Sequence, residues 1–133
     1  MTIAPLTTTT SIFVDDQDRA RDFYTRVLGY EIRADMSLGE HSWLTVGLAD
    51  GAPNQDLSLE PNEHPQAKAL QAALRDEGIP FFSIGVSDVA ASVAELRAAG
   101  VAIVQDVTHL GPVSVAVIDD TVGNLVQLAQ LHG

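Results

Sequence analysis

The sequence contains no cysteine, which excludes both disulfide bonds and thiolate metal ligands. It is also poor in basic residues, with 7 Lys and Arg against 18 Asp and Glu, and its formal net charge at pH 7 is −11. Because proteins that bind nucleic acid need clustered Lys and Arg against the phosphates, this balance argues against DNA or RNA as a partner. An acidic surface would attract a cationic small molecule, although the same excess of acid also serves solubility alone.

Long hydrophobic runs are absent as well. No apolar stretch approaches the ~20 residues that cross a bilayer, and the first residues lack the basic and apolar segments of a signal peptide. We therefore expect a cytoplasmic protein without membrane contact. The length of 133 residues, 46% of them hydrophobic, predicts one domain with a sizeable core.

A strand–helix–strand unit occurs twice in the chain. The first copy has a strand over 11–14, a helix that begins at the acidic Asp16 and ends near Gly29, and a second strand. The second copy runs over 83–106, with Asp88 and Gly100 at the corresponding places. Because the two copies match at several places in the same order, they indicate an internal repeat, and the fold is predicted from two such units.

Hydrophobic periodicity extends each copy to a βαβββ module. Module one, about 7–61, is predicted to contain strands over 7–14, 30–36, 42–48 and 56–60. The buried face of its helix is predicted to carry Ala20, Phe23, Tyr24, Val27 and Leu28. A helix over about 65–78 is predicted to link the modules, with Ala67, Leu70, Ala73 and Leu74 inward. Module two, about 81–131, is predicted to contain a helix over 89–99 and strands over 81–86, 101–106, 113–118 and 125–129.

Several motifs together resemble those of the vicinal oxygen chelate superfamily, the group of glyoxalase I, extradiol dioxygenases, fosfomycin-resistance enzymes and bleomycin-resistance proteins. The motifs are the paired modules, the Val14-x-Asp16 strand end, Phe23-Tyr24, Leu28-Gly29-Tyr30 and Asp120-x-x-Gly123-Asn124-Leu125. The resemblance covers about 7–131. It implies an α+β fold in which the strands of two tandem βαβββ modules form a curved, incomplete barrel-like sheet around a cleft, commonly in a homodimer.

The resemblance also implies where a metal ion would bind. It places Thr9, Glu60, Phe81 and Gln127 at the four positions that hold a divalent ion in metal-dependent members of the family. Phe81 has no donor atom and Thr9 offers only a neutral hydroxyl, so we expect that the metal site is lost and that no cofactor is used. A divalent metal held weakly through Glu60 and Gln127 stays open as an alternative.

Strand alternation and the family positions together predict which side chains line the cleft. They are Thr9, Ser11, Phe13, Trp43, Ser58, Glu60, Phe81 and Gln127. Glu60 is the candidate catalytic residue, since a buried carboxylate must be paired or shift its pKa upward; the alternative is a strand-end carboxylate in water. Trp43 either contacts a flat, apolar part of a ligand or packs in the core, and the second role is slightly favoured. Met36 is a further candidate for the same wall.

Two functions follow as hypotheses. The first is a metal-independent protein that binds and sequesters a small organic molecule, with cationic and aromatic compounds as the candidates. The second is a glyoxalase- or dioxygenase-like enzyme with a non-standard metal site that uses Glu60 and Gln127, with Thr9 and a nearby histidine. The histidines are predicted to be solvated or capping residues near turns or the C-terminus: His41, His64, His109 and His132. His109 has the best claim to a place at the edge of the cleft.

Overall fold

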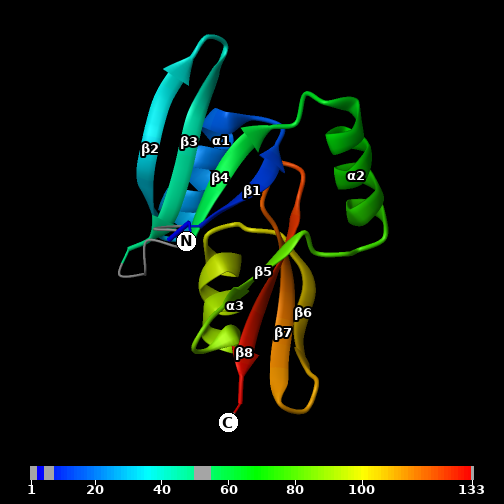
Figure 1. The fold of residues 1–133 in the computed structure, drawn as a ribbon. Helices are drawn as coiled ribbons and strands as arrows, with labels where there is room; N and C mark the ends of the chain where they lie inside the picture. Colours follow the sequence, from blue (N-terminus) through cyan, green and yellow to red (C-terminus); the bar gives the residue numbers. More distant parts are fainter. Residues whose placement is uncertain (1–2, 5–7, 50–54, 133) are drawn as a thin grey trace. The chain divides into compact units, whose positions relative to one another are not determined.

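The computed structural model describes residues 3–4, 8–49 and 55–132 (Figure 1). The chain divides into two compact units, Met1–Glu63 and His64–Gly133, and each is built on a four-stranded sheet. The predicted α+β class with two tandem modules is therefore confirmed. Neither sheet closes on itself, in agreement with an incomplete barrel. In the described part of the chain, no helix is long and apolar enough to span a membrane.

The first unit has its strands in the order β1-β4-β3-β2. Strand β1 pairs in parallel with β4, and the other neighbours are antiparallel. Its elements are β1 (Thr9–Val14), α1 (Gln17–Asp22), the π-helical η1 (Phe23–Val27), β2 (Tyr30–Leu38), β3 (His41–Leu48) and β4 (Asp56–Pro61). The predicted first residue of strand one, Thr7, lies outside the described residues, and so do residues 50–54 of the segment 49–55, whose composition predicts a turn.

The first helix begins as the sequence predicts and continues differently. Asp16 has an extended backbone and its carboxylate accepts a hydrogen bond from the Arg19 N–H at 3.0 Å, which caps α1. From Phe23 the turn widens, and the Leu28 N–H donates to the Phe23 carbonyl five residues back. Ala20, Phe23 and Tyr24 are buried as predicted, whereas Val27 and Leu28 are only half-buried. The wider turn rotates these last two residues away from the predicted face.

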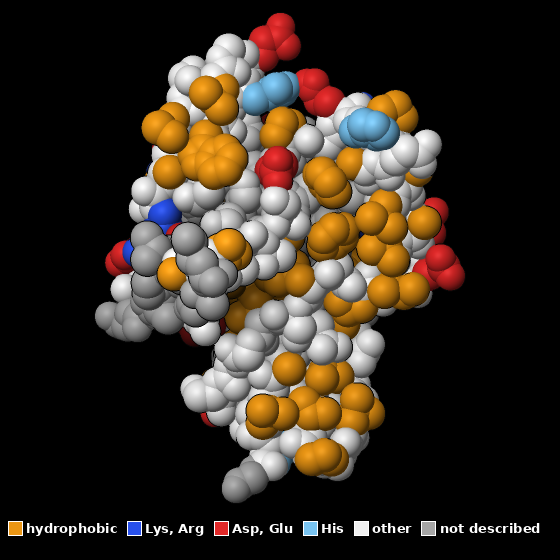
Figure 2. Space-filling model, viewed as in Figure 1, with side chains coloured by type: hydrophobic (Ala, Val, Ile, Leu, Met, Phe, Trp, Pro, Cys, Tyr) orange, Lys and Arg blue, Asp and Glu red, His pale blue; other side chains and the backbone are white. Residues whose placement is uncertain are grey.

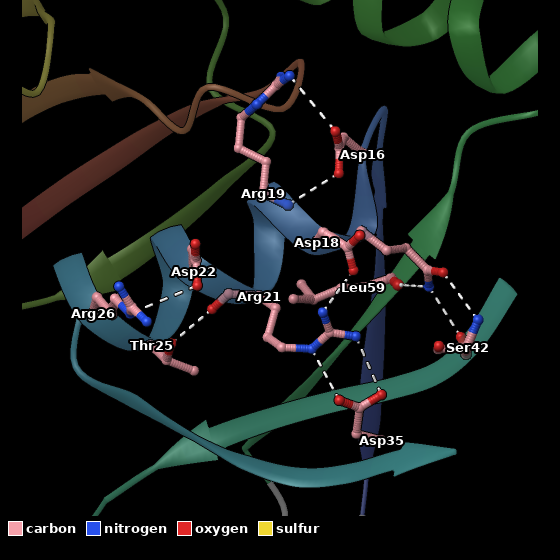
Figure 3. A network of polar contacts seen from close by, with 11 residues as sticks. Asp16, Asp18, Arg19, Arg21, Asp22, Thr25, Arg26, Asp35, Ser42 and Leu59 are labelled. Atoms are coloured by element: carbon pink, nitrogen blue, oxygen red, sulfur yellow. Dashed lines mark hydrogen bonds and ion pairs between the residues drawn. The ribbon is translucent and has the colours of Figure 1, made fainter. Parts of the chain in front are cut away.

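A polar clamp ties α1 to the sheet at its far edge (Figure 3). Arg21 donates to both carboxylate oxygens of Asp35 in β2, at 2.9 and 3.2 Å, and to Asp18 at 2.7 Å. These hydrogen bonds, to Asp18 and then Asp35, raise the pKa of Arg21 above its usual value. Beneath the helix lie the apolar side chains of the sheet: Ile12, Val14, Leu44, Val46, Leu57 and Leu59.

The second unit repeats this plan with the strand order β5-β8-β7-β6. Strand β5 is parallel to β8, and Asp88 caps its helix through a 3.0 Å hydrogen bond from the Ala91 N–H, as Asp16 does in the first unit. The elements are α2 (Pro65–Asp76), β5 (Phe82–Gly85), α3 (Val89–Ala98), β6 (Ile103–His109), β7 (Val113–Asp119) and β8 (Leu125–Leu131).

Helix α2 belongs to the second unit and packs differently from the prediction. Leu70 is 45% exposed and Ala73 is exposed, so the predicted inward face is wrong at both. Gln71 is buried instead, and its amide donates to the Asn124 side chain at 3.0 Å. A Cβ at Gly123 would lie 2.7 Å from the Gln71 amide nitrogen, so the glycine makes this close approach possible. A polar contact at the turn, which hydrophobic periodicity does not detect, therefore fixes the rotation of the helix.

The turn before β8 is organised by a buried carboxylate. Asp120 is fully buried and accepts hydrogen bonds from the Val122 N–H at 2.9 Å, the Asn124 N–H at 2.9 Å and the Asn124 side chain at 2.8 Å. Beside it, Asp119 pairs with Arg75 of α2. Burial alone would raise the pKa of Asp119, but the hydrogen bonds from Arg75 and from the Thr121 N–H lower it overall. Both acids thus have structural roles.

We expect Asp120→Ala to lower the free energy of unfolding by about 3 kcal/mol or more, because three buried donors lose their acceptor. Asp76→Ala is the control, since Asp76 is an exposed acid at the end of α2. Guanidinium denaturation of both variants measures the difference. Equal losses in the two variants would contradict a central role for the Asp120 carboxylate.

Candidate functional site

The candidate residues of the first unit share the sheet face opposite α1. The register pairs Ala34 with Thr45, Thr45 with Ser58, and Ser58 with Ser11, so one row of short side chains crosses all four strands. The next row contains the pair Met36–Trp43 and the pair Glu60–Phe13. Six predicted cleft residues therefore lie on one surface, which we call the open face: Thr9, Ser11, Phe13, Trp43, Ser58 and Glu60.

Large apolar side chains are exposed on the open face. Trp43 is 46% exposed, Met36 56% and Leu38 61%. Figure 2 shows hydrophobic side chains gathered over β2 and β3. The slight preference for Trp43 in the core is therefore wrong, because helix α1 covers the other side of its strand. Ser58, by contrast, is buried.

Glu60 is half-buried beside Phe13, at a place where β3 and β4 are not paired directly. The ladder between these strands is formed at Thr45 and Val46 only. Beyond it the Gln17 carboxamide joins them: its nitrogen donates to the Ser42 and Leu59 carbonyls at 2.9 Å each, and its oxygen accepts from the Ser42 N–H at 3.0 Å (Figure 3). A side chain from α1 thus takes the place of the ladder beside Glu60.

A charged contact that the sequence analysis missed lies at the opposite end of the open face. Arg33, at a bulge in β2, contacts Asp56 of β4 at 3.5 Å and donates to the Leu48 carbonyl at 2.6 Å. It crosses Gly47, where a Cβ would lie 2.4 Å from the Arg33 Nε. A glycine inside a strand was the available signal, since it often marks a bulge or a close approach.

The remaining candidate residues belong to the second unit. Phe81 precedes β5, and its N–H donates to the Leu125 carbonyl at 2.8 Å. Gln127 lies on β8 opposite Ser83, and its amide donates to the Ser83 hydroxyl at 3.1 Å. Phe81 is half-buried, so it offers apolar surface within its own unit.

The side chains at the family's metal positions do not fit a divalent ion. Glu60 supplies one carboxylate and Thr9 one hydroxyl; Phe81 supplies no donor, and the Gln127 amide is engaged with Ser83. The strand pairing gives a second argument against a metal ion at these positions. Ser11 pairs with Ser58 in the first unit, and Ser83 pairs with Gln127 in the second, so Ser58 and Gln127 occupy equivalent places. If the repeat is matched at Ser11 and Ser83, the residue equivalent to Glu60 is the donorless Ala129. No catalytic step through a metal at these positions can be derived.

The histidines are placed by local contacts. His64 caps α2 as predicted, because its Nδ1 accepts from the Gln66 N–H at 3.1 Å. His109 and His132 both contact the buried Ser114 hydroxyl at 2.6 Å. His41 lies against Glu63, with Glu40 beside them. This last cluster was not predicted, because Glu63 is 22 residues from His41 in the sequence.

Comparison with known proteins gives a consistent result. The family model of the "Glyoxalase/Bleomycin resistance protein/Dioxygenase superfamily" matches residues 5–128. The uncharacterized protein YurT of Bacillus subtilis (strain 168) is 43% identical over 121 residues, which are 91% of this chain and 95% of YurT. The crystal structure of UcmS2 has a TM-score of 0.79 and 32% identity, over 96% of this chain and 98% of that one. TnmS3, an antibiotic binding protein from Streptomyces sp. CB03234, has a TM-score of 0.76 over 98% of this chain and 99% of its own; at 24% identity this likeness shows the fold alone.

We expect Gln17→Met to lower the free energy of unfolding by about 2 kcal/mol, because one backbone N–H and two carbonyls lose their partner between β3 and β4. Trp43 fluorescence should also change in the folded variant, since Ser42 precedes it. Gln66→Met is the matched control, because Gln66 is exposed on α2. A Gln17→Met protein as stable as the control variant would show that the bridge does not hold the strands together.

Proposed function

This chain belongs to the glyoxalase/bleomycin resistance protein/dioxygenase superfamily, and we propose that it binds and sequesters a small organic molecule without using a metal ion. The observation that carries the proposal is the exposed apolar strip of Trp43, Met36 and Leu38 on the open face, which also carries the half-buried Glu60. Exposed side chains of this size, grouped on one surface, are typical of a binding site.

The apolar strip favours a flat or aromatic ligand. Trp43 offers a wide planar surface, and Met36, its partner across the strands, adapts its flexible thioether to different shapes. Phe13 lies on the same face, next to Glu60. A planar molecule that covers these side chains would remove their apolar surface from water, which is the main source of affinity for such ligands.

The charges of the open face favour a cationic group on that ligand. The cation of Arg33 is matched by Asp56 and Glu31, so it adds no net positive charge. Glu60 has a carboxylate beside Phe13, on the face that also carries Trp43, and the net charge of −11 attracts cations over longer distances. A cation near Trp43 would also interact with the face of its ring. We therefore propose a ligand with an aromatic body and a positive charge.

The neighbouring structures are compatible with this role. TnmS3 shares the fold and is an antibiotic binding protein, which supports a binding function on this scaffold without identifying a ligand. The enzyme alternative, with Glu60 and Gln127 at a metal, has less support because Phe81 contributes no donor. We also propose that the protein is a homodimer, as the family resemblance implies, and that it is cytoplasmic, as expected from the sequence features described first.

Trp43 is the sole tryptophan, so its fluorescence reports on the open face directly. We expect planar aromatic compounds with a cationic substituent to change this signal at lower concentrations than otherwise identical neutral or anionic compounds, with EDTA present throughout. Glu60→Gln should weaken binding of the cationic compound roughly 3- to 10-fold, as for a partly exposed ion pair worth about 1 kcal/mol, and leave the neutral one unchanged.

Glu77→Gln, at an exposed site after α2, serves as the control and should bind like the parent protein. Each incubated compound is then recovered and analysed by mass spectrometry. Recovery of unaltered compound supports sequestration. Chemical conversion, or binding that appears only in a parallel titration where a divalent metal replaces the EDTA, would refute the proposal in favour of an enzyme.

A further inference from the structure

Three potential metal ligands that the proposed function does not use meet where the end of the β2–β3 hairpin approaches the segment after β4. Glu40, His41 and Glu63 each offer a donor atom, and these atoms all lie within 4.8 Å of one another. The imidazole Nε2 of His41 faces a Glu63 carboxylate oxygen. Figure 2 shows a histidine and acidic side chains at this end of the hairpin.

The backbone that presents these side chains is fixed on both sides. Gly39 and Glu40 form a two-residue loop between the paired Leu38 and His41, and Gly39 has the positive φ of 68° that a tight hairpin requires. On the other side, the Asn62 N–H donates to the Val14 carbonyl at 3.0 Å and thereby holds the chain next to Glu63. Backbone contacts of the sheet therefore fix the main-chain positions from which the three side chains extend.

Electrostatics at this cluster also favour a cation. Two carboxylates face one imidazole, so the cluster is negatively charged even when His41 is protonated. Within residues 3–4, 8–49 and 55–132, each of the six arginines forms an ion pair with an acid outside the cluster: Arg19, Arg21, Arg26, Arg33, Arg75 and Arg97. A bound dication would neutralise this excess.

We propose that Glu40, His41 and Glu63 bind one divalent transition-metal ion, with Zn²⁺ as the natural candidate. An imidazole nitrogen with two carboxylate oxygens is a donor set that suits zinc, and magnesium or calcium would prefer oxygen ligands alone. Three protein ligands leave a coordination position for water. This site uses none of the side chains at the family's positions, Thr9, Glu60, Phe81 and Gln127, and it does not depend on the proposed function.

The sole tryptophan lies close enough to report on the ion. His41 and Trp43 are alternate residues of β3, so they share one face of the strand and lie ~7 Å apart along it. Cu²⁺, which binds such donors more tightly than Zn²⁺, quenches a nearby indole. Quenching of Trp43 therefore locates the ion independently of an affinity measurement.

The test uses the full chain, stripped with a chelator and desalted, and titrated with Zn²⁺ in a calorimeter. We expect one equivalent to bind, and His41→Gln and Glu63→Gln each to weaken binding by about 10-fold or more, at least the usual loss from altering a residue that supports a metal ligand. Both residues are substantially exposed, so the variants should keep the parent's circular dichroism and melting temperature. One equivalent of Cu²⁺ should quench Trp43 in the parent and much less in His41→Gln.

Two matched variants serve as controls. His64→Asn removes the neighbouring imidazole and keeps a side chain able to cap α2, and Glu77→Gln removes an exposed carboxylate elsewhere. Both should bind Zn²⁺ like the parent. The proposal is overturned if the parent binds no Zn²⁺, if His41→Gln binds as tightly as the parent, or if His64→Asn loses binding equally. Because the organic-ligand titrations contain EDTA, failure of this site leaves them unaffected, and their failure leaves this site standing.

Discussion

The parallel pairing of the first and last strands of each module is the constraint on which the rest of the structure depends. It joins β1 to β4 and β5 to β8, and it brings together residues that are about 45 positions apart in the chain. Once Ser11 is paired with Ser58, the alternation of side chains decides which residues lie under helix α1 and which remain on the open face. A shift of β4 by one residue would exchange its two sets of side chains, placing Leu59 on the open face and Glu60 beneath the helix.

Each module then holds its helix to the sheet with a glutamine, but by a different route. In the first, Gln17 on α1 reaches between β3 and β4. In the second, Gln130 on β8 accepts a hydrogen bond from the Val89 N–H at the start of α3, at 2.9 Å. The repeat therefore preserves the architecture and not the individual contacts. The separation of β3 from β4 beside Glu60 is a feature of the first module, and it sets the surroundings of the carboxylate that we assign to ligand binding.

The sequence was sufficient to predict the fold because its main signals are local. Each signal is recognised from a few neighbouring residues. These signals are the alternation of polar and apolar side chains along the strands, the N-capping residues Asp16 and Asp88, and the glycines at the helix ends. The errors have two causes. A contact distant in sequence places Gln71, and not Leu70, against the turn at Gly123, and the locally widened turn of η1 rotates Val27 outward. The same explanation holds for the site. Alternation placed Phe13 and Glu60 on one face, whereas the bridge by Gln17 and the approach of Glu63 to His41 depend on how strands that are distant in sequence meet.

The central claim is that the open face of the first sheet binds a small molecule. Backbone amide chemical shifts, followed by NMR while a cationic aromatic compound is added, test it most directly. The account predicts the largest changes in β1, β3 and β4 around Phe13, Trp43 and Glu60, with little effect on the exposed side of α1. Changes concentrated on α1, or scattered without any maximum on the open face, would contradict it.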